Sequence, residues 1–255
     1  MSIDTETRGR ILLITLNRPE AMNALDADHA EALERAIVGF QEEPDLWVAI
    51  ITGTGRAFSA GMDLVRSAPR TLLEAREGAV PRPNLLQRLQ VDKPLIAAVN
   101  GYCMAAGFGL ALLCDVRIAS EKAIFRATGA GRGILAGGTQ AVRLPRLVGL
   151  GRALEMLLWS RNVDAHQAER FGLVSCVVPE NELLPTAWRW AEESCQLAPL
   201  AVQAAKEVAV RGIDMSLTEA FRLENEVAGR VRRTADAEEG ITAFREKRPP
   251  RFQGR

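Results

Sequence analysis

Two glycine-bearing segments of the chain combine features that can stabilise a negatively charged oxygen. Residues 53–64 read GTGRAFSAGMDL and residues 100–115 read NGYCMAAGFGLALLCD, and each follows an apolar run and leads into a helical pattern. Small residues let the backbone approach closely, and the first turn of a helix presents N–H groups that lack intrahelical partners. Two such turns side by side can direct N–H groups at one oxyanion. The same pattern also fits two tight turns without a chemical role.

Side chains that carry protons or act as nucleophiles are sparse. The two histidines are His29, for which we expect a packing or solvent-facing role, and His166, close to Asp164, which we interpret as a helix N-cap. Cys103 lies in the second glycine-bearing segment, just before Ala105-Ala106-Gly107, but no histidine is near it in the sequence, so we interpret it as a buried, unreactive thiol. The four cysteines contain no C-x-x-C pair, and we expect no metal site.

The elements around these segments predict an α/β fold. Apolar runs typical of strands are followed by helical patterns, which indicates a sheet covered on both faces; the predicted strands are Ile11–Leu16, Trp47–Thr52, Leu95–Val99, Val116–Ala119 and Leu173–Val178. From Asn181 onward the pattern is only helical, over Glu182–Leu197, Leu200–Arg211 and Leu217–Arg233. We therefore predict a core over residues 1–180 and a helical region over 181–255. The segment Ser67–Pro83 has no clear period and is predicted to be a mobile loop over a pocket.

Composition excludes several functions. Lys plus Arg and Asp plus Glu are 32 each in 255 residues, so the chain has no global charge for binding nucleic acid or an anionic membrane. No long uncharged apolar window predicts a membrane span, and the polar N-terminus does not look like a secretory signal. We expect a cytoplasmic protein.

An ordered series of motifs from about residue 10 to 248 resembles the crotonase (enoyl-CoA hydratase/isomerase) family. The motifs are Asn17-Arg18-Pro19 with Asn23-Ala24-Leu25, Gly55 through Leu64, Lys93-Pro94, Ala97 through Gly101, Leu113-Cys114-Asp115, Gly137-Gly138-Thr139-Gln140, Ala168 with Gly172-Leu173-Val174, and Phe244 through Arg248. The resemblance implies a spiral of ββα turns, a C-terminal helical region for trimerisation, often as a dimer of trimers, and a coenzyme A thioester as substrate. It implies no permanently bound cofactor.

By position, the resemblance assigns the family's two oxyanion-hole amides to the backbone N–H groups of Met62 and Ala106. It assigns contacts with coenzyme A to Asn23, Ala24, Phe58, Ala60, Asp63, Leu64, Phe244 and Lys247, the last two often across a subunit boundary. An alternative for Asp63 is that its carboxylate caps the following turn. The basic residues near the C-terminus fit a solvated tail as well as a phosphate contact.

The chain departs from the family where a hydratase carries its two glutamates. The first position, one helical turn after Ala106, is Gly109, and the second falls at Gly129. No Asp or Glu occurs from Lys122 to Gly151, and the stretch before Gly137 is slightly shorter than in the family. General acid–base catalysis typically contributes about 100 to 10,000-fold, so loss of both groups should nearly abolish hydration.

Three hypotheses remain open from the sequence. The first is an enzyme that stabilises a thioester enolate and uses a replacement base, for example Glu74 or Glu77. The second is decarboxylation of a malonyl-type thioester, in which bond cleavage itself makes the enolate; Arg126 and Arg132 flank the second vacant position and can bind a substrate carboxylate. The third is a non-catalytic subunit that binds acyl-CoA.

Overall fold

The computed structural model describes residues 3–63, 66, 76–77 and 85–255. The predicted mobile loop Ser67–Pro83 therefore lies almost wholly outside the described residues, as do Leu64 and Glu74. Glu77 is described and is exposed to solvent.

The larger of two sheets has six strands in the order β1-β2-β3-β5-β7-β10. Its strands are β1 (Ile3–Arg8), β2 (Ile11–Leu16), β3 (Val48–Gly53), β5 (Leu95–Val99), β7 (Val116–Ser120) and β10 (Cys176–Val178). β1 and β2 are antiparallel and the other neighbours are parallel. The predicted strands coincide with β2, β3, β5, β7 and, over its last residues, β10.

A smaller sheet in the order β4-β6-β8-β9 repeats the path of the larger one. Its strands are β4 (Ala57–Ser59), β6 (Tyr102–Met104), β8 (Ile124–Arg126) and β9 (Val163–Asp164). β3 is followed by β4, β5 by β6 and then a helix, and β7 by β8, so each turn of the chain adds one strand to each sheet. This repetition is the ββα spiral, and the predicted fold class is confirmed.

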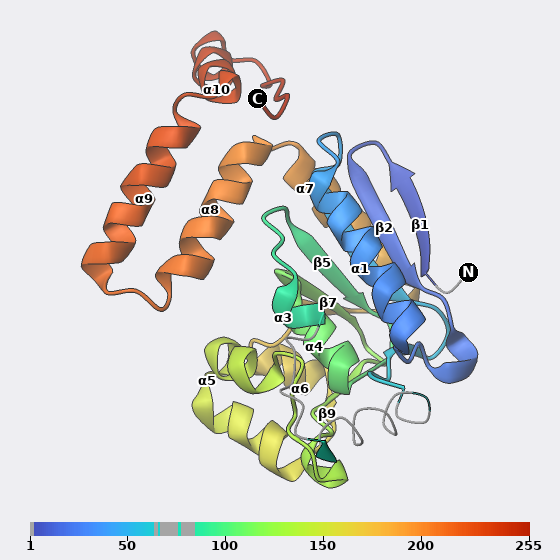
Figure 1. The fold of residues 1–255 in the computed structure, drawn as a ribbon. Helices are drawn as coiled ribbons and strands as arrows, with labels where there is room; N and C mark the ends of the chain where they lie inside the picture. Colours follow the sequence, from blue (N-terminus) through green and yellow to red (C-terminus); the bar gives the residue numbers. More distant parts are fainter. Residues whose placement is uncertain (1–2, 64–65, 67–75, 78–84) are drawn as a thin grey trace.

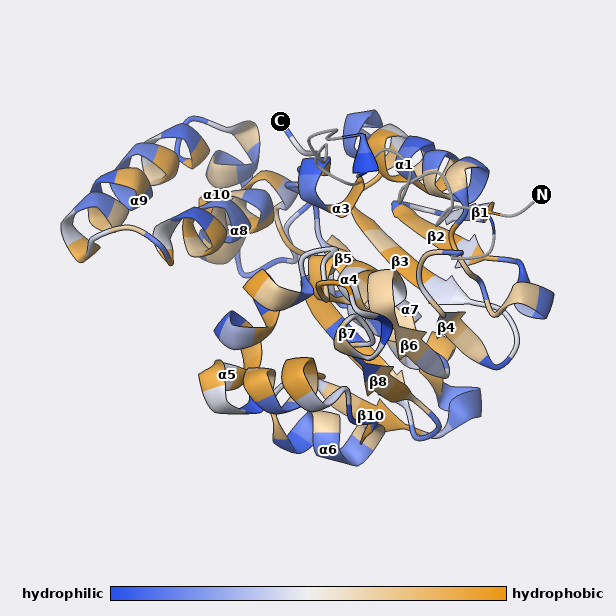
Figure 2. Ribbon diagram, turned by 60° about the horizontal axis from the view of Figure 1, so that its bottom comes forward, coloured by the Kyte–Doolittle hydropathy of each residue, from blue (hydrophilic) through white to orange (hydrophobic). Residues whose placement is uncertain are grey.

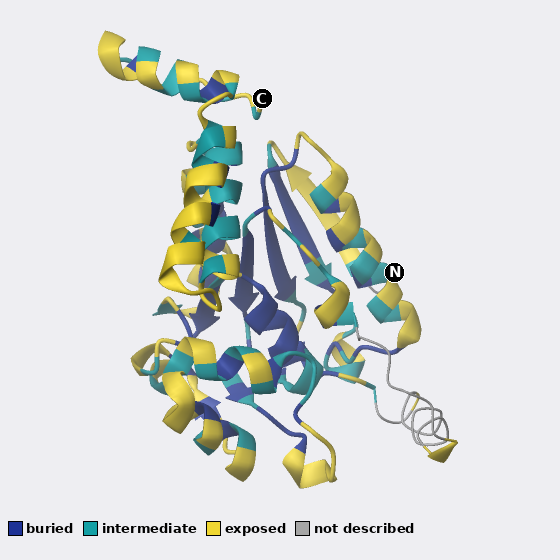
Figure 3. Cartoon of the chain, turned by 60° about the vertical axis from the view of Figure 1, so that its left-hand side comes forward, coloured by how far each residue is buried: buried dark blue, intermediate teal, exposed yellow. Residues whose placement is uncertain are grey.

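Helices cover both faces of the larger sheet (Figure 1). α1 (Ala27–Glu42) and α4 (Ala105–Leu113) pack on one face, and α7 (Leu183–Cys195) packs on the other. Successive residues of β2 alternate between the two cores, with Ile14 in the first and Leu13 in the second. A strand buried on both sides gains from apolar residues throughout, which is why these runs are continuous rather than alternating. Figure 3 shows the inner strands of this sheet as buried.

The remaining helices of the core lie around the smaller sheet. They are α3 (Leu85–Arg88), α5 (Gln140–Trp159) and α6 (Ala165–Arg170). α4 is buried nearly all round, from Gly107 to Leu113, and consists only of apolar residues and glycine (Figure 2). Its Phe108 contacts Phe125 of β8, with ring centroids 5.7 Å apart. α4 thus connects the two sheets and fixes the position of the second glycine-bearing segment.

The C-terminal helices α8 (Pro199–Gly212), α9 (Leu217–Val231) and α10 (Ala235–Glu246) extend away from the sheets (Figure 1). α7 begins just after the predicted boundary at residue 181, yet packs against the large sheet rather than with these three. The last residues turn back, and Phe252 packs on the second core beside Trp47. Within the described residues, no helix is long and apolar enough to cross a membrane.

Candidate active site

A cavity of about 430 Å³ lies where the two glycine-bearing segments meet. Its walls come from the N-terminus of α1, the turn after β4, α3, the start of α4 and the segment from Thr128 to Gln140. The lining residues are Leu25, Asp26, Ala27, Ala30, Ala60, Met62, Leu85, Leu86, Ala105, Ala106, Thr128, Gly129, Arg132, Ile134, Leu135, Ala136, Gly137, Gly138 and Gln140. Most of them are apolar, as in sites that bind an organic ligand.

The first glycine-bearing segment brings Met62 to this cavity. The Leu25 N–H donates to the Gly61 carbonyl at 2.7 Å, and the Asp63 N–H donates to the Leu25 carbonyl at 2.9 Å. This parallel bridge fixes the turn on both sides of Met62. The Met62 N–H itself has no hydrogen-bond acceptor among the described residues. The amide is therefore available to a ligand.

The second segment places Ala106 in the first turn of α4. The N-cap residue Met104 makes no side-chain capping bond, so the first N–H groups of the helix have neither a cap nor an intrahelical partner. The two turns touch: a Cβ added to Gly61 would lie 2.7 Å from the Ala106 nitrogen, and Gly61 has φ of 92°. Glycine at position 61 is therefore required both by its conformation and by this contact. Met62 and Ala106 line the same cavity as a result.

The segment before α5 fills the space beside Gly109 and Gly129. A Cβ added to Gly109 would lie 2.0 Å from the Gly138 carbonyl oxygen, and one added to Gly129 would lie 2.4 Å from the Ala136 nitrogen. Side-chain atoms essentially never approach a backbone atom this closely. Neither position can therefore hold a glutamate unless the main chain from 135 to 138 moves.

Asp26 is the one carboxylate that lines the cavity among the residues described. Its Oδ1 accepts from the His29 N–H at 3.0 Å and lies 2.5 Å from His29 Nδ1, while its Oδ2 accepts from Arg18 at 3.0 Å and Arg66 at 2.8 Å. Burial alone would raise the pKa of the Asp26 carboxyl, but the hydrogen bonds from His29 and Arg66 outweigh burial and hold that pKa well below its ordinary value. A carboxylate whose negative charge is already paired with arginines and whose oxygens already accept hydrogen bonds is a weak proton acceptor.

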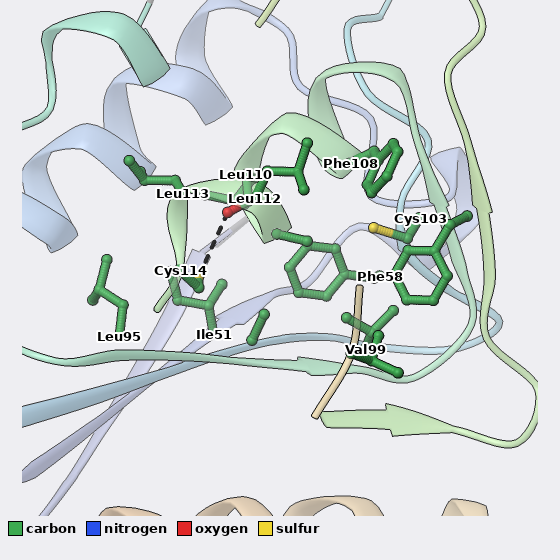
Figure 4. Close-up of a cluster of buried hydrophobic side chains, with 14 of the residues drawn as sticks. Ile51, Phe58, Leu95, Val99, Cys103, Phe108, Leu110, Leu112, Leu113 and Cys114 are labelled. Carbon is green, nitrogen blue, oxygen red and sulfur yellow. Dashed lines mark hydrogen bonds between the residues drawn. The ribbon is translucent and has the colours of Figure 1, made fainter. Parts of the chain in front are cut away.

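The residues assigned to coenzyme A are only partly brought together. Ala60 lines the cavity, and Ala24 is half-buried next to Leu25. Asn23 is 2% exposed. Its side-chain amide accepts a hydrogen bond from the backbone N–H of residue 18 and donates to the backbone carbonyls of residues 54 and 57. Phe58 is completely buried in the first core (Figure 4). These last two side chains hold the loops in place and do not reach the cavity.

Asp63 caps the turn that follows it, which is the alternative to a contact with coenzyme A. Its carboxylate accepts from the Arg66 N–H at 3.2 Å, as a cap of the turn that follows, and lies 3.4 Å from Arg18. Phe244, 86% exposed, and Lys247, at the end of α10, do not line the cavity. Any contact between those two residues and a ligand in this cavity would have to come from another subunit.

Cys103 and the metal-ligating residue types have no catalytic arrangement. Cys103 is fully buried in the first core, and burial raises the pKa of its thiol well above the ordinary value (Figure 4). The described part of the chain contains no group of His, Cys, Asp or Glu that fits a metal ion. Asp164 caps α6, as expected, by accepting from the Gln167 N–H at 2.8 Å.

Sequence reasoning missed the contribution of the backbone between Leu135 and Gly138. It singled out Arg126 and Arg132, of which only Arg132 lines the cavity. The short stretch before Gly137 was the available signal, because a shorter connection must lie closer to the elements that it joins.

Comparison with known proteins covers the whole chain. A family model described as enoyl-CoA hydratase/isomerase matches residues 6–255. The chain is 40% identical over 257 residues to an (E)-benzylidenesuccinyl-CoA hydratase of Thauera aromatica, covering 100% of both chains. It is 41% identical over 249 residues to a 2,3-dehydroadipyl-CoA hydratase of Escherichia coli, covering 96% of each. A crystal structure of an enoyl-CoA hydratase from Bacillus anthracis matches with a TM-score of 0.93 and 34% identity, covering 100% of both chains.

These full-length similarities agree with the ordered motifs and with the ββα spiral of paired sheets. The chain belongs to the enoyl-CoA hydratase/isomerase family of the crotonase superfamily.

Proposed function

We propose that this enzyme binds an acyl-CoA thioester in the 430 Å³ cavity and stabilises its enolate with the backbone N–H groups of Met62 and Ala106. We propose further that it does not hydrate enoyl-CoA through a pair of glutamates. The observation that carries the second part is the backbone of residues 135–138, which occupies the space beside both Gly109 and Gly129.

The first part rests on the chemistry of a thioester. When a proton or a carboxylate leaves the carbon next to the thioester, negative charge develops on the carbonyl oxygen. Preorganised N–H groups stabilise that charge, and loss of one such donor typically lowers the rate about 100–1,000-fold. Met62 and Ala106 line one cavity, and neither amide is capped by a protein side chain, which supports their use for this purpose.

The second part follows from the proton transfers that hydration needs. Water must be deprotonated and a carbon protonated, and each transfer requires a positioned group with a suitable pKa. The described cavity offers Asp26, whose oxygens are held by two arginines and His29. A carboxylate whose pKa is lowered in this way does not replace a glutamate base.

Decarboxylation of a malonyl-type thioester is a second candidate, favoured by the same lack of a free carboxylate among the described residues of the cavity. In this reaction the bond between the α-carbon and the carboxylate breaks, and its electron pair forms the enolate while CO₂ leaves. The enolate then takes one proton from water, so no protein base has to remove a proton. The oxyanion hole alone supplies the main stabilisation.

One assay with two substrates tests these proposals. Crotonyl-CoA is incubated at high enzyme concentration, and its ultraviolet absorbance and product masses are followed, with the Bacillus anthracis enoyl-CoA hydratase as the positive control. We expect hydration at least about 100-fold slower than in that control. Malonyl-CoA is then supplied in D₂O, where decarboxylation should give acetyl-CoA that carries one solvent deuteron.

Hydration at a rate comparable with the control would overturn the second part, and Glu74 and Glu77 would be the first residues to replace, since they are the candidate bases that the sequence offers. Binding of thioesters without turnover of either substrate would instead favour the non-catalytic acyl-CoA-binding subunit.

A further inference from the structure

The segment from Lys122 to Gly151 concentrates positive charge beside the cavity. It contains five cationic side chains and no carboxylate, although the whole chain is electrically balanced. Lys122 pairs with Glu180 and Arg146 pairs with Asp214, so both of these charges are compensated on the outer surface. Arg132 lies in the same segment but lines the cavity.

Arg132 is a cation of this cavity wall to which the described residues offer no counter-charge. It ends a short 3-10 helix, Ala130–Arg132, and the structure gives its guanidinium no ion pair or hydrogen bond with any described residue. The other charged residue in the described lining, Asp26, is compensated by Arg18 and Arg66. The cavity therefore presents one positive charge that is free to bind an anion.

A backbone donor in the wall of the same cavity also lacks an acceptor among the described residues. The neighbouring Ile134 and Gly137 N–H groups donate to Gly129 and Leu135 carbonyls, at 3.1 and 2.7 Å. The N–H of Ala136, a residue that is only 8% exposed and lines the cavity, has no acceptor among the described residues. An N–H that lines a cavity and has no protein acceptor is available to a ligand atom.

We infer that the acyl group carries a carboxylate of its own, which is bound by the Arg132 guanidinium and the Ala136 N–H. This inference rests on the proposed function, because it assumes that the thioester occupies the same cavity. Apolar residues of the same cavity wall, Leu85, Leu86 and Ile134, suit the methylene groups of such an acid. A glutamate at position 129 would repel the carboxylate, and glycine there removes that repulsion.

Binding of matched thioesters to the full-length protein tests the inference. The probes are succinyl-, glutaryl- and adipyl-CoA, each compared with the analogue in which the terminal carboxylate is a neutral primary amide. Because none of these acids carries its carboxylate on the α-carbon, decarboxylation does not interfere. Isothermal titration calorimetry should show at least one acid binding about tenfold tighter than its amide, since charge-assisted hydrogen bonds are roughly twice as strong as neutral ones.

Variants assign the preference to Arg132. Arg132→Leu should lower the acid-to-amide ratio to about one while leaving amide affinity within about twofold, and Arg132→Lys should retain part of the preference. Arg189→Leu, which removes one positive charge from α7 on the opposite face of the large sheet, is the matched control and should keep the full ratio.

Two results would overturn the inference alone: ratios near one for all three acids in the wild-type protein, or a preference that survives Arg132→Leu. Both leave thioester binding intact. Failure of the acids and the amides alike to bind would overturn the proposed function as well.

Discussion

Gly109 lies inside α4, where glycine is ordinarily the wrong residue. An alanine in a helix interior is more stable than a glycine by about 0.5–1 kcal/mol, because glycine has more backbone freedom to lose on folding. The Gly138 carbonyl oxygen, 2.0 Å from where the Cβ would lie, reverses that preference. The residue is therefore selected by a backbone contact with a segment nearly thirty positions away in the chain, Gly137–Gly138.

Gly109→Ala should destabilise the protein by roughly 1–3 kcal/mol, because the helix or the opposing segment must shift. The free energy of unfolding is measured from urea titrations. Gly151→Ala is the matched control, since Gly151 also lies in a helix but has no atom within 4 Å of its Cβ position; that change should stabilise by about 0.5–1 kcal/mol. Equal effects of the two substitutions would contradict the close contact at Gly109.

The glycine turns could be predicted from the sequence, and the family resemblance assigned their amides, whereas the backbone around Ala136 could not be predicted. The turn at Gly61 needs a positive φ and small neighbours, and glycine and alanine in the sequence indicate both. The position of the Gly138 carbonyl depends on the length of a connection and on how α5 packs, which no local pattern encodes. Phe58 illustrates the converse: its place in the motif was evident, but its burial in the core only emerged from tertiary packing.

At the scale of elements, one carboxylate, that of Asp26, both caps the N-terminus of α1 and lines the cavity. Asp26 caps the helix through the His29 N–H and also accepts hydrogen bonds from Arg18 and Arg66, which lie in two other segments. Three separate segments therefore depend on the charge of a single residue.

This arrangement predicts a pH dependence of stability. The pKa of Asp26 is lowered in the folded protein, so its contribution is complete above the ordinary value of 3.8 and is lost as the pH falls below it. Between pH 7 and pH 3, urea titrations of Asp26→Asn should show a smaller loss of stability than the wild type, by on the order of 1–2 kcal/mol. Asp28→Asn, in the same helical turn, should follow the wild-type curve; identical pH profiles for all three proteins would refute the prediction.

Element prediction succeeded for long apolar strands and failed for short ones. β5 was predicted with the same bounds that the structure gives, because five apolar residues between turn signals are a clear pattern. The strands of the smaller sheet have two or three residues each and were not predicted. β1 was missed because its residues are mostly polar and exposed at the edge of the large sheet. Such short strands can be recognised only from the repeated order of the spiral, in which β4, β6 and β8 each follow a strand of the larger sheet.

At the scale of the whole molecule, apolar side chains remain uncovered on the C-terminal helices. Ile213, Leu217 and Phe221, at the turn between α8 and α9, are 61%, 71% and 54% exposed. Figure 2 shows apolar residues along the same helices. Large exposed apolar groups of this kind are typical of a surface that another subunit covers.

We expect the protein to assemble as a trimer or a dimer of trimers, with a mass by light scattering of three or six times 27.8 kDa. Leu217→Glu with Phe221→Glu should lower the mass, because two buried charges would oppose association. Glu224→Ala, on the same helix, should leave it unchanged. A monomeric wild-type protein would rule out this assembly.

The contacts at Gly109 and Gly129 also bear on how the enzyme can evolve. Each glutamate would enter a space that the backbone of residues 135–138 already occupies, so either substitution alone would be selected against before it could confer an activity. A descendant could acquire both carboxylates only after an insertion had lengthened the connection before α5. The length of that connection would therefore restrict which chemistry this lineage can gain.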